Sequence, residues 1–157
     1  MLIAVFSDTH GNTAPMFRAV GECKPDMVLH LGDCCRDADA LRMKFPGLDV
    51  RSVRGNCDYG RDEEEKLLVR AGGVNIFMTH GHIYRVKYTL DMLRTAAQLT
   101  GAQLTVFGHT HQAEYRGEYG IELLNPGSAG MPPRMSYARV EIRDGAAFCK
   151  LVPLTDE

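Results

Sequence analysis

The hydrophobic positions of this chain fall into short runs separated by polar, glycine-rich segments. Residues 1–7 are apolar almost throughout and residues 27–31 are apolar apart from one histidine, which is typical of buried strands, and residues 48–53 are predicted as a third strand. Between them, residues 13–22 and 37–45 have the pattern of helices. Thr13 is a candidate cap of the first helix, and Pro15 falls in its first turn, where proline is tolerated. This alternation predicts right-handed βαβ units and a mostly parallel sheet.

The pattern changes in the second half of the chain. Two strand-like runs flank Gly72-Gly73, which predicts a two-residue hairpin over residues 66–79. A helix is predicted over residues 88–99, because Leu90, Leu93 and Ala97 lie on one face. Short strands separated by turns complete the chain, at 103–107, 113–116, 121–124, 137–142 and 146–152, with Asp144-Gly145 in the last hairpin. We expect an α/β fold of two sheets packed face to face with helices outside, and a ligand site at the strand ends.

Composition narrows the function classes. The 157 residues are expected to form one domain over 1–157, and 45% apolar with 24% charged residues is ordinary for a globular protein. The net charge is −2 and no Lys/Arg cluster occurs, which disfavours duplex nucleic acid and anionic membranes as partners but not a small anionic substrate. Five cysteines without repeated spacing indicate no disulfide framework, and residues 1–6 are too short and lack the basic flank of a signal peptide. We expect a cytoplasmic protein.

Five polar motifs follow apolar runs and carry the candidate chemistry. They are Asp8-Thr9-His10, Gly32-Asp33, Gly55-Asn56-Cys57-Asp58, Thr79-His80-Gly81-His82 and Gly108-His109-Thr110-His111. Five of the six histidines lie in these motifs. Histidine, carboxylate and amide groups from separate loops are the ligands that a cluster of divalent metals needs, so the set indicates metal-assisted hydrolysis.

The spacing within the motifs is informative. Asp8 and His10 are two residues apart, as are His109 and His111, so in an extended segment both side chains of a pair would project the same way. Asp33 and Asn56 each follow a glycine, which allows a sharp turn or a close approach of the backbone.

The series Asp-x-His, Gly-Asp, Gly-Asn-x-Asp, His and Gly-His-x-His resembles the signature of calcineurin-like metallophosphoesterases. Together with Asn125-Pro126-Gly127-Ser128, it is similar to the YfcE-type phosphodiesterases. The resemblance covers essentially the whole chain and implies a four-layer sandwich of two mixed sheets flanked by helices, with a two-metal centre. It assigns Asp8, His10, Asp33 and His111 to the first metal, and Asp33, Asn56, His80 and His109 to the second, with Asp33 bridging. Manganese is the first choice, and nickel, iron, cobalt and zinc are compatible with the same ligands.

The implied reaction is the hydrolysis of small phosphodiesters by a metal-bridging hydroxide. Two divalent ions bring +4 and the two aspartates −2, which leaves a charge of +2 to bind hydroxide and phosphate.

Many members of the superfamily have histidine after the asparagine, where it protonates the leaving group, whereas this chain has Cys57. A thiol is a poor replacement for imidazole as an acid, which favours diesters with good leaving groups. Cys57 and His82 are the candidate catalytic residues, and the alternative for His82 is a residue that steadies His80.

Other reactive side chains have structural interpretations. Cys34 and Cys35 are expected to be small loop residues, and His30 a strand residue. Arg134 could reach a substrate phosphate or form an ion pair. Met16, Met43 and Met92 are expected to be core residues. The acidic residues 62–65 are expected to form a solvated loop.

Two alternatives to a phosphodiesterase stay open. One is a non-catalytic scaffold with this fold, like the retromer subunit; all seven ligand positions carry competent residues, which argues against it. The other is a phosphomonoesterase or protein phosphatase, which Cys57 and the short chain disfavour. Exposed strand edges are compatible with a homodimer.

Overall fold

The computed structural model describes residues 1–118 and 120–155, and its strands form two sheets of five. The first sheet has the order β10-β9-β1-β2-β3 and the second β4-β5-β6-β8-β7. The strands of the first sheet are β1 (Leu2–Phe6), β2 (Met27–His30), β3 (Asp49–Ser52), β9 (Ser136–Arg143) and β10 (Ala146–Pro153). Those of the second are β4 (Lys66–Ala71), β5 (Val74–Thr79), β6 (Leu104–Val106), β7 (Glu114–Glu118) and β8 (Ile121–Asn125).

Both sheets are mixed, so the prediction of a mostly parallel sheet is only partly right. Strands β1, β2 and β3 are parallel, as the helices between them require. The C-terminal hairpin then joins the same sheet, because β9 pairs antiparallel with β1. In the second sheet β5, β6 and β8 are parallel, and β4 and β7 are antiparallel edges. The predicted hairpin over 66–79 is confirmed.

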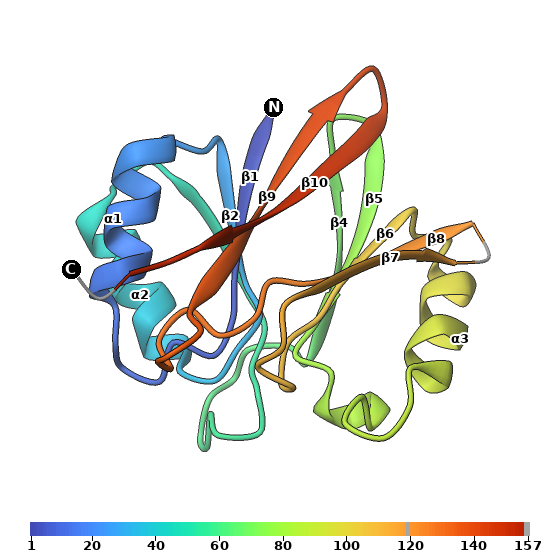
Figure 1. The fold of residues 1–157 in the computed structure, drawn as a ribbon, viewed down its shortest axis with the longest axis horizontal. Coiled ribbons are helices and arrows are strands. Elements are labelled where there is room, and N and C mark those ends of the chain that lie inside the picture. The colour runs from blue at the N-terminus through green and yellow to red at the C-terminus, as the bar shows by residue number, and fades with distance from the viewer. Residues whose placement is uncertain (119, 156–157) are drawn as a thin grey trace.

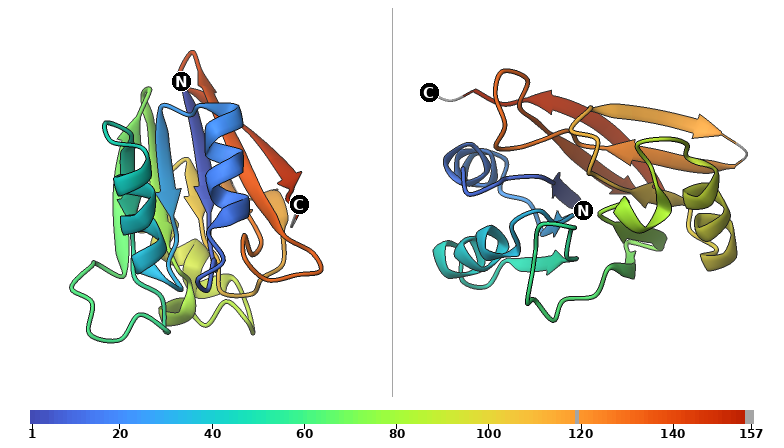
Figure 2. Two further views of the ribbon diagram at one scale, coloured as in Figure 1. Left: turned by 90° about the vertical axis from the view of Figure 1, so that its left-hand side faces the viewer. Right: turned by 90° about the horizontal axis from the view of Figure 1, so that it is seen from below.

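Three helices cover the outer faces of the sheets, which gives the four layers visible in Figure 1. Helices α1 (Ala14–Cys23) and α2 (Cys35–Lys44) lie on the first sheet, and α3 (Asp91–Thr100) lies on the second. A short 3-10 helix, η1 (His82–Tyr84), leads from β5 towards α3. The view from below in Figure 2 shows the same arrangement of helices outside two sheets. Among the described residues, no helix is both long and apolar enough to cross a membrane.

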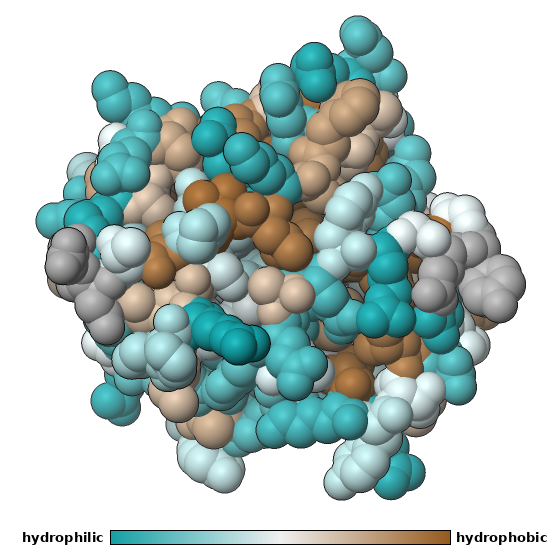
Figure 3. Space-filling model, in the orientation of Figure 1, coloured by the Kyte–Doolittle hydropathy of each residue, from teal (hydrophilic) through white to brown (hydrophobic). Residues whose placement is uncertain are grey.

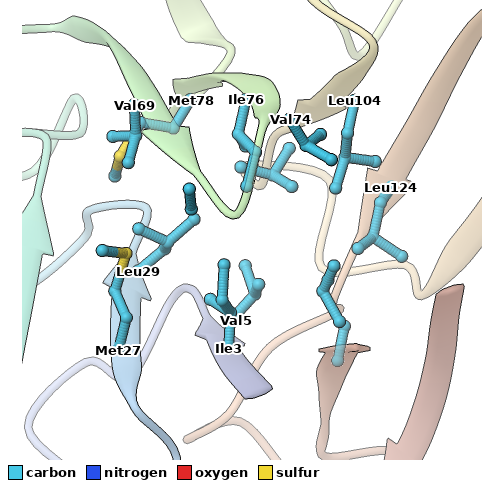
Figure 4. Close-up of a cluster of buried hydrophobic side chains, with 14 of the residues drawn as sticks. Ile3, Val5, Met27, Leu29, Val69, Val74, Ile76, Met78, Leu104 and Leu124 are labelled. Carbon is cyan, nitrogen blue, oxygen red and sulfur yellow. The ribbon is translucent and has the colours of Figure 1, made fainter. Parts of the chain in front are cut away.

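The largest apolar cluster fills the space between the two sheets. Ile3 and Leu29 from the first sheet face Ile76 and Leu104 from the second, and all four are fully buried (Figure 4). These strands read as continuous apolar runs because their other faces are also covered, by α1 and α2 on one side and α3 on the other. Figure 3 shows a mostly polar face with an apolar patch over β10, the edge strand of the first sheet.

Some local expectations were wrong. Thr13 stands at the N-cap of α1, but its side chain makes no capping hydrogen bond. Met16 is fully buried as expected, whereas Met43 is 82% exposed and Met92 48% exposed. Met43 is on an exposed face of α2, and Met92 lines an open cavity with residues of β4 and β5, which a residue's apolar character alone does not reveal.

Candidate metal centre

The five motifs meet at one end of the sandwich, below the sheets in Figure 1. Asp8, Asp33 and Asn56 follow the carboxyl ends of β1, β2 and β3, and His80 and His109 follow those of β5 and β6. Parallel strands present their carboxyl ends at the same edge of a sheet, and face-to-face packing brings the two edges together. Residues as far apart in the sequence as Asp8 and His111 thereby share one site.

Six of the seven predicted ligands form two compact groups. Asp8, His10 and His111 make one, and Asp33, His80 and His109 make the other. Within each group, one ligand atom from every residue lies within 4.8 Å of the others. No further group of this kind was found among the described residues, and the acidic residues 62–65 belong to neither.

Asp8 is fully buried, and its two oxygens have different surroundings. Oδ2 accepts hydrogen bonds from the Ser7 hydroxyl at 2.5 Å and the His109 backbone N–H at 3.1 Å. Oδ1 has no hydrogen-bond partner among the described residues, and it lies 3.0 Å from His111 Nε2 and 3.8 Å from His10 Nε2. Burial raises the pKa of Asp8, but the nearby imidazoles of His10, His111 and His80 outweigh it and hold the pKa far below its usual value. The carboxylate is therefore charged and directed at the histidines.

Asp33 belongs to the second group and also faces His10 of the first. Its Oδ2 is 3.4 Å from His80 Nε2 and 3.9 Å from His10 Nε2, and its Oδ1 accepts the backbone N–H of Cys57 at 3.0 Å. Burial raises its pKa, while hydrogen bonding and the charge of His80 lower it, with a net fall to about 2. A carboxylate in this position can reach an ion in either group.

His80 has a ring orientation set by the backbone. Its Nδ1 lies 2.8 Å from the Leu31 carbonyl oxygen, which can only accept, so Nδ1 carries a proton and donates it. Nε2 then faces Asn56 Oδ1 at 3.1 Å, His109 Nδ1 at 3.2 Å and Asp33 Oδ2. Burial lowers the pKa of His80, but the two aspartates outweigh it and raise the pKa. Burial, with the charge of His80, lowers the pKa of His109 to about 4.

The residue pairs spaced by two do not reach the site as extended segments, which corrects the reasoning from spacing. Asp8 and His10 have φ of 54° and 47°, and His109 and His111 have φ of 70° and 58°. Left-handed backbone at residues other than glycine is uncommon and costly, and it concentrates at functional sites. The ligands of each pair converge because the backbone curls around the site.

The glycines before Asp33 and Asn56 allow two loops to touch, as predicted. A Cβ atom on Gly32 would lie 2.5 Å from the Gly55 nitrogen, and one on Gly55 would lie 2.1 Å from Asp33 Oδ1. Gly108 has the same role against the loop of Asp8, since a Cβ there would lie 2.0 Å from Ser7 Oγ. Only glycine permits these approaches.

Asp58 is a positioning residue whose role the sequence did not reveal. Its carboxylate is buried and accepts the backbone N–H groups of Asp33, Gly55 and Cys35 at 2.7–3.0 Å, and that of Cys34 at 3.2 Å. It thereby joins the loop of Asp33 to the loop of Asn56. The only signal was an acidic residue within the Gly-Asn-Cys-Asp motif.

Three further residues stabilise the loops of the candidate site by hydrogen bonds to their backbone. Ser128 donates to the Asp8 carbonyl at 2.7 Å, Asn125 donates to the Gly108 carbonyl at 3.2 Å, and Asp37 accepts the Gly11 N–H at 2.9 Å. The first two belong to the Asn-Pro-Gly-Ser motif noted in the sequence. Asp37 falls in the first turn of α2, where acidic residues are common for helical reasons alone, so its contact with the Asp8–His10 loop was not predictable.

The two candidate catalytic residues lie beside the metal groups. The His82 ring centroid is 5.5 Å from that of His80, and its Nε2 is 3.6 Å from Glu65 Oε1. Burial and the charge of His80 lower the pKa of His82. Cys57 is exposed, and burial together with the charge of Asp33 raises the pKa of its thiol.

The remaining side chains mostly behave as expected. His30 ends β2 fully buried, 3.1 Å from Thr9 Oγ1, and Cys35 is buried with its thiol donating to the Val53 carbonyl. Cys34 is half-buried at the start of α2. Arg134 makes no ion pair with any described residue, so nothing supports the structural alternative for it.

The sequence is similar to those of known metallophosphoesterases. A probable metallophosphoesterase of Bacillus subtilis, YsnB, is 33% identical over 94% of this chain and 88% of its own length. The phosphodiesterase YfcE of Escherichia coli is 32% identical over 59% of this chain and 51% of its own length.

Solved structures show the same fold. A predicted phosphoesterase of Streptococcus pneumoniae has a TM-score of 0.80 at 31% identity, covering 97% of this chain and 88% of that one. Vps29 of Entamoeba histolytica in complex with Zn²⁺ has a TM-score of 0.76 at 24% identity, covering 98% and 99%, which shows a shared fold alone. The family profile described as the calcineurin-like phosphoesterase superfamily domain matches residues 1–145. With its fold, its motifs and its candidate metal ligands in agreement, the chain belongs to the calcineurin-like phosphoesterase superfamily.

Proposed function

We propose that this protein is a phosphodiesterase that hydrolyses small phosphodiesters with two divalent metal ions. One observation carries the proposal: two groups of three candidate ligand residues lie side by side, and Asp33 of the second group also approaches His10 of the first. The ligand sets are those already expected, Asp8, His10, Asp33 and His111 for one ion and Asp33, Asn56, His80 and His109 for the other.

The donor set fits cations. Around His80 Nε2 the neighbours are Asn56 Oδ1, Asp33 Oδ2 and His109 Nδ1, and the first two can only accept. Asp8 Oδ1 is buried without a hydrogen bond. Such acceptors repel one another unless a proton or a cation lies among them. The raised pKa values of His10 and His80 show that protons are stabilised at these positions, and a divalent ion satisfies the same acceptors.

When bound, two such ions activate water and neutralise charge on the phosphoryl oxygens. The chain's own residues supply rigidity. The Leu31 carbonyl keeps the lone pair of His80 Nε2 directed at the site, and the Cys57 N–H orients Asp33. Since the ligands are neutral apart from two aspartates, two divalent ions would leave a net positive charge that attracts an anionic substrate. Mixed nitrogen and oxygen ligands are compatible with manganese, our first choice.

The diester preference rests on the residue after Asn56. Cys57 has a raised thiol pKa and is a weak proton donor to an alkoxide. His82 has a lowered pKa and is therefore mostly neutral near pH 7, which leaves little imidazolium to donate a proton. Substrates with acidic leaving groups suit such a site. The phosphodiesterase name of the YfcE relative supports the same class.

The runner-up is a metal-binding scaffold without turnover. Because Vps29, which shares the fold, has been crystallised with Zn²⁺, metal binding alone does not separate the two functions. The complete ligand set favours an enzyme, since a scaffold is free to lose ligands.

The test is a hydrolysis panel. The protein is stripped with a chelator, refilled separately with Mn²⁺, Ni²⁺, Co²⁺, Fe²⁺ and Zn²⁺, and assayed on bis(p-nitrophenyl) phosphate and p-nitrophenyl phosphate. We expect turnover of the diester with at least one metal, and weaker turnover of the monoester. Stoichiometric metal binding without turnover of either ester would favour the scaffold, and a monoester preference would contradict the diester assignment.

A further inference from the structure

A cavity of about 460 Å³ opens directly beside the candidate metal centre. Its wall includes His10, a proposed ligand, and Cys57, the residue after the proposed ligand Asn56. A substituent attached to a phosphorus atom at the centre can therefore extend into this cavity. Tyr59 and Arg36 form its outer wall, and the tyrosine ring is almost fully exposed to an incoming group.

Besides His10, three charged residues line this cavity, Asp58, Arg61 and Arg36, and the candidate for binding an anion is Arg36. It is exposed at the start of α2, and with the described residues it makes neither an ion pair nor a hydrogen bond. The other arginine of the cavity, Arg61, is already neutralised, because its guanidinium contacts Asp39 at 2.8 Å and also pairs with Glu63. Arg36 is thus the cation of this cavity that is open to an external anion.

The carboxylates near Arg36, whether close in the sequence or part of the cavity wall, are engaged in other contacts. Asp37 accepts the Gly11 N–H, and Asp58 accepts four backbone N–H groups of two loops. Asp39 is held by Arg42 and Arg61. These contacts hold the neighbouring negative charges in place, so an anion approaching Arg36 need not displace an existing ion pair.

We propose that this cavity binds one ester substituent of the substrate and that Arg36 recognises a second anionic group, a carboxylate or a phosphate, on that substituent. The guanidinium is always charged, and its planar set of donors matches both groups. The inference rests on the proposed function and narrows it: the substrate is a small phosphodiester with an additional negative charge. A second cavity, of about 790 Å³ beside His111, contains Arg134, but leucine and proline from 151–154 line much of it, which suits an uncharged substituent.

The test measures binding without turnover, so that its outcome is separate from that of the hydrolysis panel. The probes are two non-hydrolysable phosphodiester analogues, dibenzylphosphinate and benzyl(4-carboxybenzyl)phosphinate, which differ only in one carboxylate. Their dissociation constants for the Mn²⁺-loaded protein are determined by calorimetry, for the wild type and for Arg36→Gln, Arg36→Lys, Arg134→Gln and Arg70→Gln. Arg70 is an exposed arginine of β4 at the hairpin end of the strand, away from the site, and serves as the matched control.

We expect the wild type to bind the carboxylated probe about fivefold to tenfold more tightly than the plain one, as for a partly exposed charge-assisted hydrogen bond. Arg36→Gln should abolish this preference, Arg36→Lys should keep part of it, and Arg70→Gln should keep all of it. Equal affinities in the wild type, or a preference that survives in Arg36→Gln, would overturn the proposal. A preference lost in Arg134→Gln but kept in Arg36→Gln would assign the anion to the other cavity and refute the role of Arg36.

Discussion

The carboxylate of Asp58 offers the sharpest test of how the site is held together. Its Oδ1 accepts the N–H groups of Cys34 and Cys35, and its Oδ2 accepts those of Asp33 and Gly55. In Asp58→Asn one oxygen becomes an NH₂ group, which cannot accept and would face two donors. Two hydrogen bonds to a charged, buried acceptor are lost, each worth about 1.5–3 kcal/mol. We therefore expect the free energy of unfolding to fall by about 3–6 kcal/mol, a large part of the ~5–15 kcal/mol typical of a domain.

Urea denaturation of the metal-free protein, followed by circular dichroism, measures this loss. Asp62→Asn is the matched control, because Asp62 is exposed in the same loop, and it should change the stability by less than about 0.5 kcal/mol. A loss below about 1 kcal/mol in Asp58→Asn would refute the four-bond arrangement. Metal titration provides the second reading: since Asp58 links the loops of two proposed ligands, Asp33 and Asn56, affinity for at least one ion should fall as well. A destabilised variant with unchanged metal affinity would show that Asp58 supports the fold and not the site.

Three further changes test individual parts of the site. Asp33→Ala should remove both metals and nearly all activity, whereas His111→Ala should leave one ion largely bound; elemental analysis of the purified variants distinguishes them, and full metal content in the first would contradict bridging. Gly108→Ala forces a Cβ against the loop of the first aspartate and should lower the metal content, while Gly117→Ala, whose Cβ meets nothing within 4 Å, should not; equal metal content in both would show that the close approach is dispensable. Cys57→His should reduce the dependence of the rate on leaving-group pKa across aryl diesters, and an unchanged slope would place leaving-group protonation elsewhere.

The strands and the residues of the two candidate metal groups could be predicted from the sequence, because both depend on local pattern. Apolar runs such as Met27–His30 mark strands with two covered faces, and polar motifs follow where the runs end. The hairpin at Gly72-Gly73 was predictable for the same reason, since two residues determine the turn. The bounds of helices were less predictable: residues 85–88 form turns after η1, and α3 begins at Asp91, three residues later than expected.

Sheet membership was decided by the tertiary structure alone. Nothing near residues 136–143 indicates that β9 pairs with β1, or that β6 lies between β5 and β8. These strand pairings depend on how the apolar faces of distant strands pack in the core, and not on the residues next to each strand in the sequence. They also explain the mixed sheets that the strand–helix alternation did not predict.

The candidate site also combines features that the sequence predicts with features that only the tertiary structure determines. Its ligand residue types were evident in the sequence, but the curled backbone at Asp8 and His10, the orientation of His80 by the Leu31 carbonyl and the four donors on Asp58 were not. Each arises when loops from distant segments pack and every buried polar group must find a partner. Among the described residues Arg36 has no ion-pair or hydrogen-bond partner, and this too is decided by packing, because Asp37, Asp39 and Asp58 are engaged in other contacts. Residue identity determines which chemistry is available, and packing determines which groups remain free to perform it.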